Sequence, residues 1–386
     1  RNTFGAQQML VFFGKIAAHF GRIIRDGGCL VDENAVDNEK AEKYVVRSAG
    51  KDNLKASDDL FARFVEEIHR RGMRIILDGV FNHCGSFNKW LDVEGIYRRA
   101  GDYEPGAYES GDSPYRGFFR FHDESQGAWP DNRTYDGWWG HDTLPKLNYE
   151  NSEKLVEYVL HIARKWISPP YSVDGWRLDV AADLGHTAEY NHEFWREFRR
   201  AVKAVNPDVL ILAEHYGDPA PWLEGDQWDS IMNYDAFMEP LTWFLTGMEK
   251  HSDSYNDSLW GDGEAFFNAM SYHMSRMQTN TVMTAMNQLS NHDHSRFLTR
   301  TNQTVGRIGT MGGRQAEENV KLCVLREAVV IQMTWPGAPT LYYGDEAGVC
   351  GWTARRPFTM VTRPASAASP IRTAGEPIHG GMRIWS

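Results

Sequence analysis

Residues 173–180 read Val-Asp-Gly-Trp-Arg-Leu-Asp-Val, and this stretch decides how the chain is expected to fold. This stretch follows a segment of helical period at 152–167 and is expected to form a strand of a parallel sheet. Arg177 and Asp179 stand two positions apart, so both side chains project to the same face of the strand. The stretch therefore predicts a strand with paired charges at its carboxyl end.

Helical and strand patterns alternate along the rest of the chain. Helices are expected from residue 60, after the capping residues Ser57-Asp58-Asp59, and over 152–167 and 193–205. Further strands are expected at 73–81, 209–213, 231–234, 282–289 and 340–343. Strands and helices that alternate at this cadence predict a parallel sheet with right-handed crossovers.

Polar side chains cluster directly after these strands: Asn82, His83, Asp179, Glu214, His292, Asp293, Asp345 and Glu346. In a β/α barrel the carboxyl ends of all strands meet at one mouth, so residues far apart in sequence can share a site. A doubly wound open sheet is the alternative, but the sequence has no glycine-rich phosphate loop to support it. We therefore expect an α/β fold, a (β/α)8 TIM-type barrel.

The barrel is expected to be interrupted and flanked by other segments. Residues 84–150 lack long periodic patterns, which predicts an inserted domain between the third strand and the third helix. The barrel itself is expected over 56–83 and 151–353, followed by an irregular tail at 354–386. Residues 1–55 contain no recognisable first or second strand, so we expect an incomplete barrel whose open edges favour association.

Composition narrows the class of partner. The formal net charge of −11 argues against nucleic acid, because binding to phosphates needs clustered Lys and Arg. The aromatic stretch 135–140 lies in a Gly/Asp-rich region and suits a neutral sugar, although most single Trp residues in a protein belong to the core. The apolar run at 9–13 is too short to span a membrane, so no membrane partner is expected. The oligomeric state stays open.

The cysteines bear on the compartment. Cys29, Cys84, Cys323 and Cys350 show neither paired CxxC spacing nor a zinc pattern, which favours a reducing, cytoplasmic location. The chain opens on Arg1 rather than Met, so a secreted form whose leader was removed earlier stays open.

The acids at the strand ends suit glycoside hydrolysis, which needs a carboxylate nucleophile and a carboxylic acid on opposite sides of the scissile bond. Arg177 would hold Asp179 ionised, although a purely structural ion pair fits that segment equally well. Glu214 follows the apolar strand 209–213, where desolvation can keep an acid protonated. The candidate strand-end acids are Asp78, Asp179, Glu214 and Asp293.

Four segments carry a family resemblance. They are DGVFNH at 78–83, GWRLDVAAD at 175–183, AEHYGD at 213–218 and NHD at 291–293. In this order they resemble the four signature motifs of the α-amylase family of glycoside hydrolases. LPKLN at 144–148 resembles the extra motif of the neopullulanase, cyclomaltodextrinase and maltogenic amylase subgroup, and GDEAG at 344–348 resembles the family's turn after the eighth strand.

The resemblance implies a retaining hydrolase that cleaves α-1,4, and in some members α-1,6, bonds through a covalent glycosyl-enzyme. Its substrates would be maltooligosaccharides, cyclodextrins, pullulan or starch, and a sugar could replace water as acceptor. By motif position, Asp179 would be the nucleophile, Glu214 the acid/base and Asp293 the carboxylate that stabilises the transition state.

The same resemblance assigns supporting roles. Arg177 would orient Asp179, His83 and His292 would bind sugar hydroxyls in subsite −1, and Asp78 would support them. Asn82 stands where many members place a calcium ligand. Since the subgroup often works without that ion, no cofactor is expected to be required and calcium stays open.

The chain departs from the subgroup pattern near these motifs. Ala182-Asp183 replace the usual Asn-Glu, and His215-Tyr216 replace a Trp-containing pair, which leaves the acceptor preference open. The alternatives are a catalytically impaired glucan-binding protein, or an α-glucosidase or sugar isomerase of the same family. The intact acids Asp179, Glu214 and Asp293 favour the hydrolase.

Overall fold

The computed structural model describes residues 51–350, apart from residues 96, 99–102, 123–134, 251–253 and 307–312. Within the described residues, unit 1 comprises 51–232 and 276–285, and unit 2 comprises 233–275 and 286–350. The expectations for residues 1–50, including Cys29 and the first two strands, and for the tail lie outside the described residues. An incomplete barrel therefore stays a prediction.

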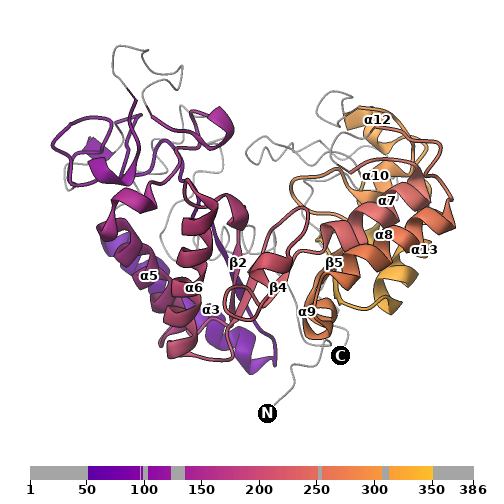
Figure 1. Cartoon of the computed structure of the whole chain (residues 1–386), viewed down its shortest axis with the longest axis horizontal. Helices are drawn as coiled ribbons and strands as arrows, with labels where there is room; N and C mark the ends of the chain where they lie inside the picture. The colour runs from indigo at the N-terminus through magenta and orange to yellow at the C-terminus, as the bar shows by residue number, and fades with distance from the viewer. Residues whose placement is uncertain are drawn as a thin grey trace, which may run out of the picture. The chain divides into compact units, whose positions relative to one another are not determined.

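Unit 1 is built on a parallel sheet with the order β1-β2-β3-β4 (Figure 1). Its strands are β1 Ile76–Gly79, β2 Gly175–Leu178, β3 Leu210–Ala213 and β4 Ser230–Ile231. All four residues of β2 are buried, the charged Arg177 among them. The register sets Asp78 opposite Arg177, which brings the charged residues of two strands to one place.

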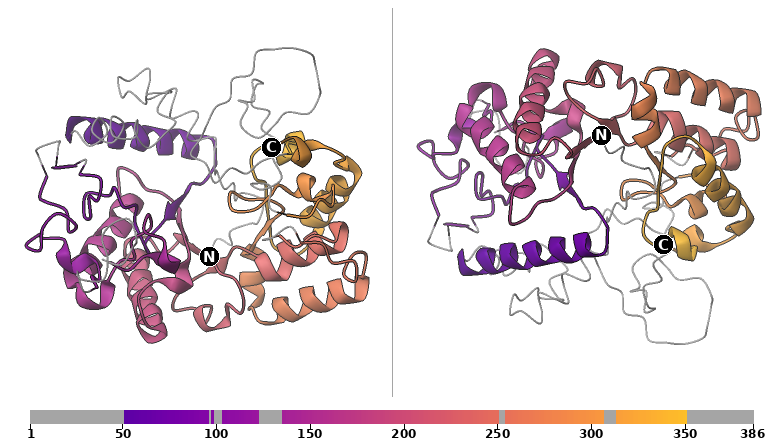
Figure 2. Two further views of the ribbon diagram at one scale, coloured as in Figure 1. Left: turned by 90° about the horizontal axis from the view of Figure 1, so that it is seen from above. Right: turned by 90° about the horizontal axis from the view of Figure 1, so that it is seen from below.

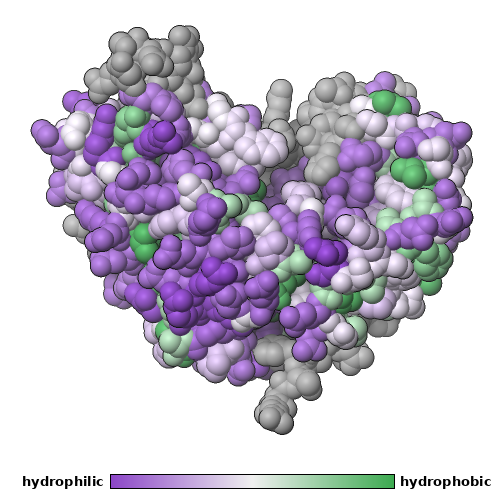
Figure 3. Space-filling model, viewed as in Figure 1, coloured by the Kyte–Doolittle hydropathy of each residue, from purple (hydrophilic) through white to green (hydrophobic). Residues whose placement is uncertain are grey.

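Helices α3 Lys51–Arg70, α5 Glu153–Ile167 and α6 Ala188–Val205 lie beside this sheet (Figures 1 and 2). The rings of Phe61 and Trp166 join α3 to α5 at 5.3 Å between centroids, and Phe81 contacts Phe198 of α6 at 5.7 Å. The face of unit 1 seen in Figure 3 is mostly hydrophilic. Unit 1 also holds the short helix α9 Thr279–Thr284.

Two helix starts were predicted wrongly. α3 begins at Lys51, and Asp59 pairs with Lys55 one turn earlier at 2.7 Å instead of capping the helix. α6 begins at Ala188, because the Thr187 hydroxyl accepts a hydrogen bond from the Tyr190 amide and supplies the cap. The predicted helix over 152–167 is confirmed, with Ser152 as its cap.

The described part of 84–150 contains no long helix, as its lack of periodicity predicted. It holds the 3-10 helices η2 Arg116–Phe118, η4 Trp138–Gly140 and η5 Tyr149–Asn151. Isolated antiparallel bridges, such as His83 with Lys146 and Gly137 with Pro145, tie it to the end of β1 and to itself. Its status as a separate inserted domain stays a prediction.

Unit 2 contains the parallel pair of β5 Met286–Gln288 and β6 Ala338–Thr340. Its helices are η8 Tyr234–Met238, α7 Glu239–Thr246, α8 Gly263–Ser275, α10 Phe297–Arg300, α12 Gly313–Glu317, α13 Leu322–Thr334 and η9 Asp345–Ala347. A core that includes Phe237, Leu241 and Met270 joins η8, α7, α8, α10 and α13. None of the helices within the described ranges of either unit has the length and apolar content of a membrane span.

Each of the six predicted strands corresponds to an observed strand with different bounds, and three of them differ most. Residues 279–284 form α9, so the strand expected over 282–289 is limited to β5. The strand expected at 340–343 ends at Thr340, because the amide of Asp345 bonds the carbonyl of Tyr342 and closes a turn. The strand expected at 231–234 ends at Ile231, and Tyr234 begins η8.

Candidate active site

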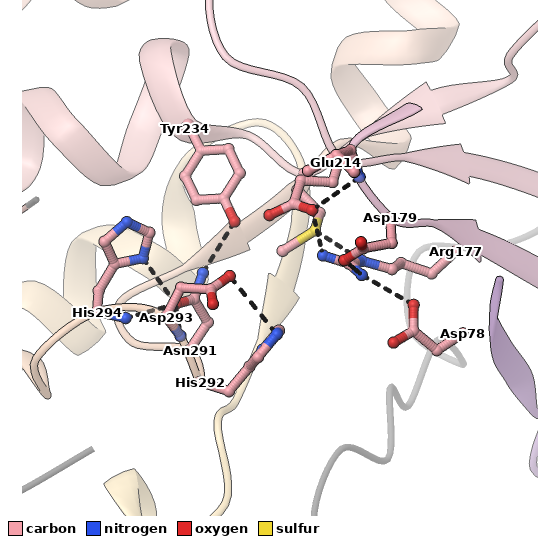
Figure 4. Close-up of polar contacts among 11 residues, drawn as sticks. Asp78, Arg177, Asp179, Glu214, Tyr234, Asn291, His292, Asp293 and His294 are labelled. Carbon is pink, nitrogen blue, oxygen red and sulfur yellow. Dashed lines mark hydrogen bonds and ion pairs between the residues drawn. The ribbon is translucent and has the colours of Figure 1, made fainter. Parts of the chain in front are cut away.

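Arg177 is the centre of a carboxylate cluster at the ends of three neighbouring strands of unit 1 (Figure 4). Its Nη1 lies 2.8 Å from Asp78 Oδ1 and 2.6 Å from Asp179 Oδ1. Its Nη2 lies 2.7 Å from Glu214 Oε2. The structure thus brings four of the predicted site residues together, with three carboxylates around the guanidinium of Arg177.

The electrostatics of this cluster favour a permanent positive charge at its centre. Burial opposes the charge on Arg177, but the carboxylates of Glu214, Asp78 and Asp179 outweigh it and raise the pKa of the guanidinium above its ordinary value. Sequence reasoning expected Arg177 to orient Asp179 alone. The contact with Glu214 was missed, because the pattern within one strand does not show what the next strand brings.

Val180 is a second residue that sequence reasoning missed. Its φ of 39° and ψ of 47° lie in the left-handed region, where a β-branched residue is rare and strained. The turn directs the Val180 amide to Glu214, and N–H donates to Oε2 at 3.1 Å. The residue that follows Asp179 therefore helps to hold Glu214, and no local sequence signal marks it.

His83 lies in the same unit, in the segment that follows β1. Its ring stacks on Trp138 with 5.2 Å between centroids and 13° between planes. Burial lowers the pKa of His83, and the nearby Asp179 carboxylate opposes this only in part, so the ring is neutral at neutral pH. A neutral imidazole can both donate and accept a hydrogen bond, as binding a hydroxyl requires.

The LPKLN segment is linked to the segment after β2. Lys146 Nζ donates to the Asp183 carbonyl at 2.7 Å. The Asp183 carboxylate accepts a hydrogen bond of 2.8 Å from Trp138 Nε1. The position where the chain departs from the subgroup pattern is therefore joined to the aromatic stretch 135–140.

Asn82 is the predicted calcium ligand. It is buried, and its Oδ1 has no hydrogen-bond partner among the described residues. Calcium takes six to eight oxygen ligands, usually several of them carboxylates. No group of three His, Cys, Asp or Glu side chains that could hold a metal occurs in the described part of the chain. No step of the proposed reaction depends on calcium.

His292 and Asp293 follow β5 in unit 2, where a single amide organises the loop (Figure 4). Asn291 Oδ1 accepts hydrogen bonds from the amides of Asp293 and His294, at 3.0 and 3.2 Å, and Asn291 Nδ2 donates to the Tyr234 hydroxyl at 2.9 Å. His292 Nε2 lies 3.5 Å from Asp293 Oδ2. Both side chains are nearly half exposed, so the loop leaves them accessible.

The GDEAG segment of unit 2 is held by an ion pair between Asp345 and Arg296. Asp345 Oδ1 lies 3.0 Å from Nη1 of the buried Arg296. Burial raises the pKa of Asp345 to about 6, although Arg296 opposes the shift.

Three of the four cysteines are described, and Cys84, Cys323 and Cys350 are free thiols.

We expect Arg177→Lys to destabilise the protein by about 3 kcal/mol, because a lysine cannot serve three carboxylates and leaves buried charge unpaired. Arg74→Lys is the matched control: Arg74 is half exposed and binds Asp174, and the substitution should cost about 0.5 kcal/mol. Urea unfolding of both variants measures the difference. Equal losses would show that the cluster is not held by Arg177.

Comparisons of the sequence and the fold with known proteins identify the family of this chain. Residues 56–371 match the family model "Alpha amylase, catalytic domain". The chain belongs to the α-amylase family, which confirms the resemblance seen in its motifs. The family and its solved structures have a (β/α)8 barrel, and the parallel strands of the described residues fit it.

Individual relatives are similar over most of this chain. Neopullulanase 2 of Thermoactinomyces vulgaris is 37% identical over 309 residues, 77% of this chain and 43% of the relative. The maltogenic α-amylase of Bacillus acidopullulyticus is 33% identical over 291 residues, 75% of this chain and 41% of the relative. The chain therefore spans less than half the length of these two relatives.

A solved structure gives a similar result. The debranching enzyme of Nostoc punctiforme has a TM-score of 0.60 and 26% identity. The match covers 78% of this chain and 56% of the solved chain.

Proposed function

We propose that this chain is a retaining α-glucan hydrolase. The observation that carries the proposal is the shared guanidinium of Arg177, which binds the Asp179 and Glu214 carboxylates through different nitrogens in a member of the α-amylase family. Retaining glycosidases need their two carboxyls only about 5–5.5 Å apart, and two carboxylates on one planar fork suit that short spacing.

The proposed reaction has two steps. Asp179 attacks the anomeric carbon, the bond to the leaving oxygen breaks, and that oxygen takes the proton of Glu214. Water then attacks the same carbon, gives a proton to Glu214 and releases Asp179 from its ester. Asp293 would stabilise the positive charge that develops on the sugar ring in both steps.

Other residues would bind the sugar. His83 and His292 would hydrogen-bond its hydroxyls, and Asp78 would keep Arg177 oriented towards Asp179. His83 is suited to this by its neutral ring. These roles follow from motif position, and the contacts of Arg177 and His83 in unit 1 support them.

The substrate class rests on the relatives. Their names, neopullulanase, maltogenic α-amylase and debranching enzyme, support an α-glucan with α-1,4 and α-1,6 bonds. We propose maltooligosaccharides, cyclodextrins, pullulan or starch as substrates, with sugars as occasional acceptors. No organic cofactor is required by the family, and a cytoplasmic location remains our proposal.

Incubation with maltotriose, cyclodextrin and pullulan, with the products resolved by chromatography, tests this function. We expect glucose and maltose from at least one of the three. A calorimetric titration with the same glucans is run in parallel. Binding without any product would contradict the hydrolase and favour a catalytically impaired glucan-binding protein, as an incomplete barrel would produce.

A further inference from the structure

Two adjacent tryptophans in unit 1 extend outward from His83. The Trp139 ring lies against Trp138, with 5.2 Å between centroids and 30° between planes, and Trp138 stacks in turn on His83. Trp139 is 80% exposed, the highest value among the exposed large hydrophobic side chains of the described residues. The three rings form a ladder that leads from the buried histidine to solvent.

The backbone of Trp139 gives a second, independent observation. Its φ of 51° and ψ of 28° are left-handed, which a bulky side chain rarely adopts and which costs free energy. Exposing the indole to water is also unfavourable. Packing inside the protein explains neither feature, since so little of this ring is buried. Backbone strain that holds an apolar side chain in solvent is typical of a binding residue.

The ring beneath Trp139 is fixed in place. The Asp183 carboxylate accepts a hydrogen bond from Trp138 Nε1 at 2.8 Å, and the amide of Trp138 donates to the Leu144 carbonyl at 2.8 Å. Lys146 binds the carbonyl of Asp183. The ladder is therefore anchored to the LPKLN segment and to η6 Ala181–Asp183, which follows Asp179 in sequence.

We propose that Trp139 is a sugar-stacking platform that binds a glucose unit of the glucan beyond the unit that contacts His83, and that Asp183 is a positioning residue for it. The inference rests on the proposed function and adds a specificity-determining residue to it. A glucose ring has apolar C–H faces and a polar rim, so an exposed indole can cover a face without removing the hydroxyls from water.

The test is a calorimetric titration of the full chain with maltoheptaose, in a Glu214→Gln background that prevents turnover. Trp139→Gly should weaken binding about five- to tenfold, in line with the loss of one aromatic stacking contact. Trp139→Phe keeps a ring and should stay within about twofold. Phe87→Ala, which removes another exposed aromatic of unit 1, should leave binding unchanged.

Thermal unfolding separates a platform from a structural role. Glycine accepts a left-handed backbone without strain, so Trp139→Gly should unfold at the same or a higher temperature than the parent protein.

Asp183→Ala should weaken maltoheptaose binding, whereas Asp183→Asn keeps a hydrogen-bond acceptor and should restore it.

Two results would overturn the role of Trp139 as a platform. One is an unchanged affinity for maltoheptaose in Trp139→Gly. The other is a loss of affinity that is accompanied by a lower unfolding temperature, which would show that the variant is destabilised. Hydrolysis by the parent chain is measured separately. A parent that binds maltoheptaose but releases no product contradicts the hydrolase alone, because the titration still decides the role of Trp139. A parent that does not bind maltoheptaose overturns the platform as well.

Discussion

Asp179→Ala should lower kcat on maltotriose by about 10⁴-fold or more, because no other group would form the covalent intermediate. Asp179 follows β2 and is held by its ion pair with Arg177. Its side chain is 16% exposed, so a substrate can contact it. Arg177 keeps Asp78 and Glu214 as partners in the variant, and the fold should survive.

Two further measurements make this prediction specific. Added azide fits the space left by the carboxylate and should rescue the variant, giving a glycosyl azide of inverted configuration. Asp78→Asn is the matched control, because it also removes a partner of Arg177 but no nucleophile, and should cost less than about 100-fold. Comparable losses in both variants would mean that Asp179 acts only through Arg177.

Glu214→Gln should lower kcat/KM on maltotriose by about 10³-fold, within the range for loss of a general acid. On a maltoside with a 2,4-dinitrophenyl leaving group the loss should be about tenfold or less, since that group leaves without a proton. The comparison uses kcat/KM, which reports the first glycosyl transfer and is insensitive to slow hydrolysis of the intermediate.

Glu150→Gln serves as control for Glu214→Gln. Glu150 is a partly buried carboxylate of unit 1 that pairs with His186 at 3.1 Å. It is not one of the three carboxylates, Asp78, Asp179 and Glu214, that bind Arg177. Its substitution should affect both substrates equally. An equal loss on both substrates in Glu214→Gln would instead show that Glu214 is not the proton donor.

The sequence predicted those features of the fold that local patterns encode. The strand within 173–180 follows from the alternation of helical and strand patterns, and the shared face of Arg177 and Asp179 follows from the two-residue period of a strand. The helix over 152–167 follows from its period and its cap. The strand expected over 282–289 was wrong in its first half, because the apolar residues Val282 and Met283 suit a short helix as well as a strand.

Features that depend on contacts between segments were not predictable. The binding of Glu214 to Arg177 depends on how β3 pairs with β2, and the turn at Val180 is set by the fold around it and not by its own preference. The bond between Trp138 and Asp183 joins residues 45 positions apart. Motif resemblance proposed the catalytic acids, and the structure added these supporting contacts.

The anomeric configuration of the first product distinguishes a retaining from an inverting hydrolase. Proton NMR of maltotriose or cyclodextrin hydrolysis, recorded before mutarotation, distinguishes the two anomers. A retaining mechanism predicts that the α-anomer forms first, because two displacements at the same carbon restore the configuration. Initial release of the β-anomer would show direct attack by water and would contradict a covalent intermediate on Asp179.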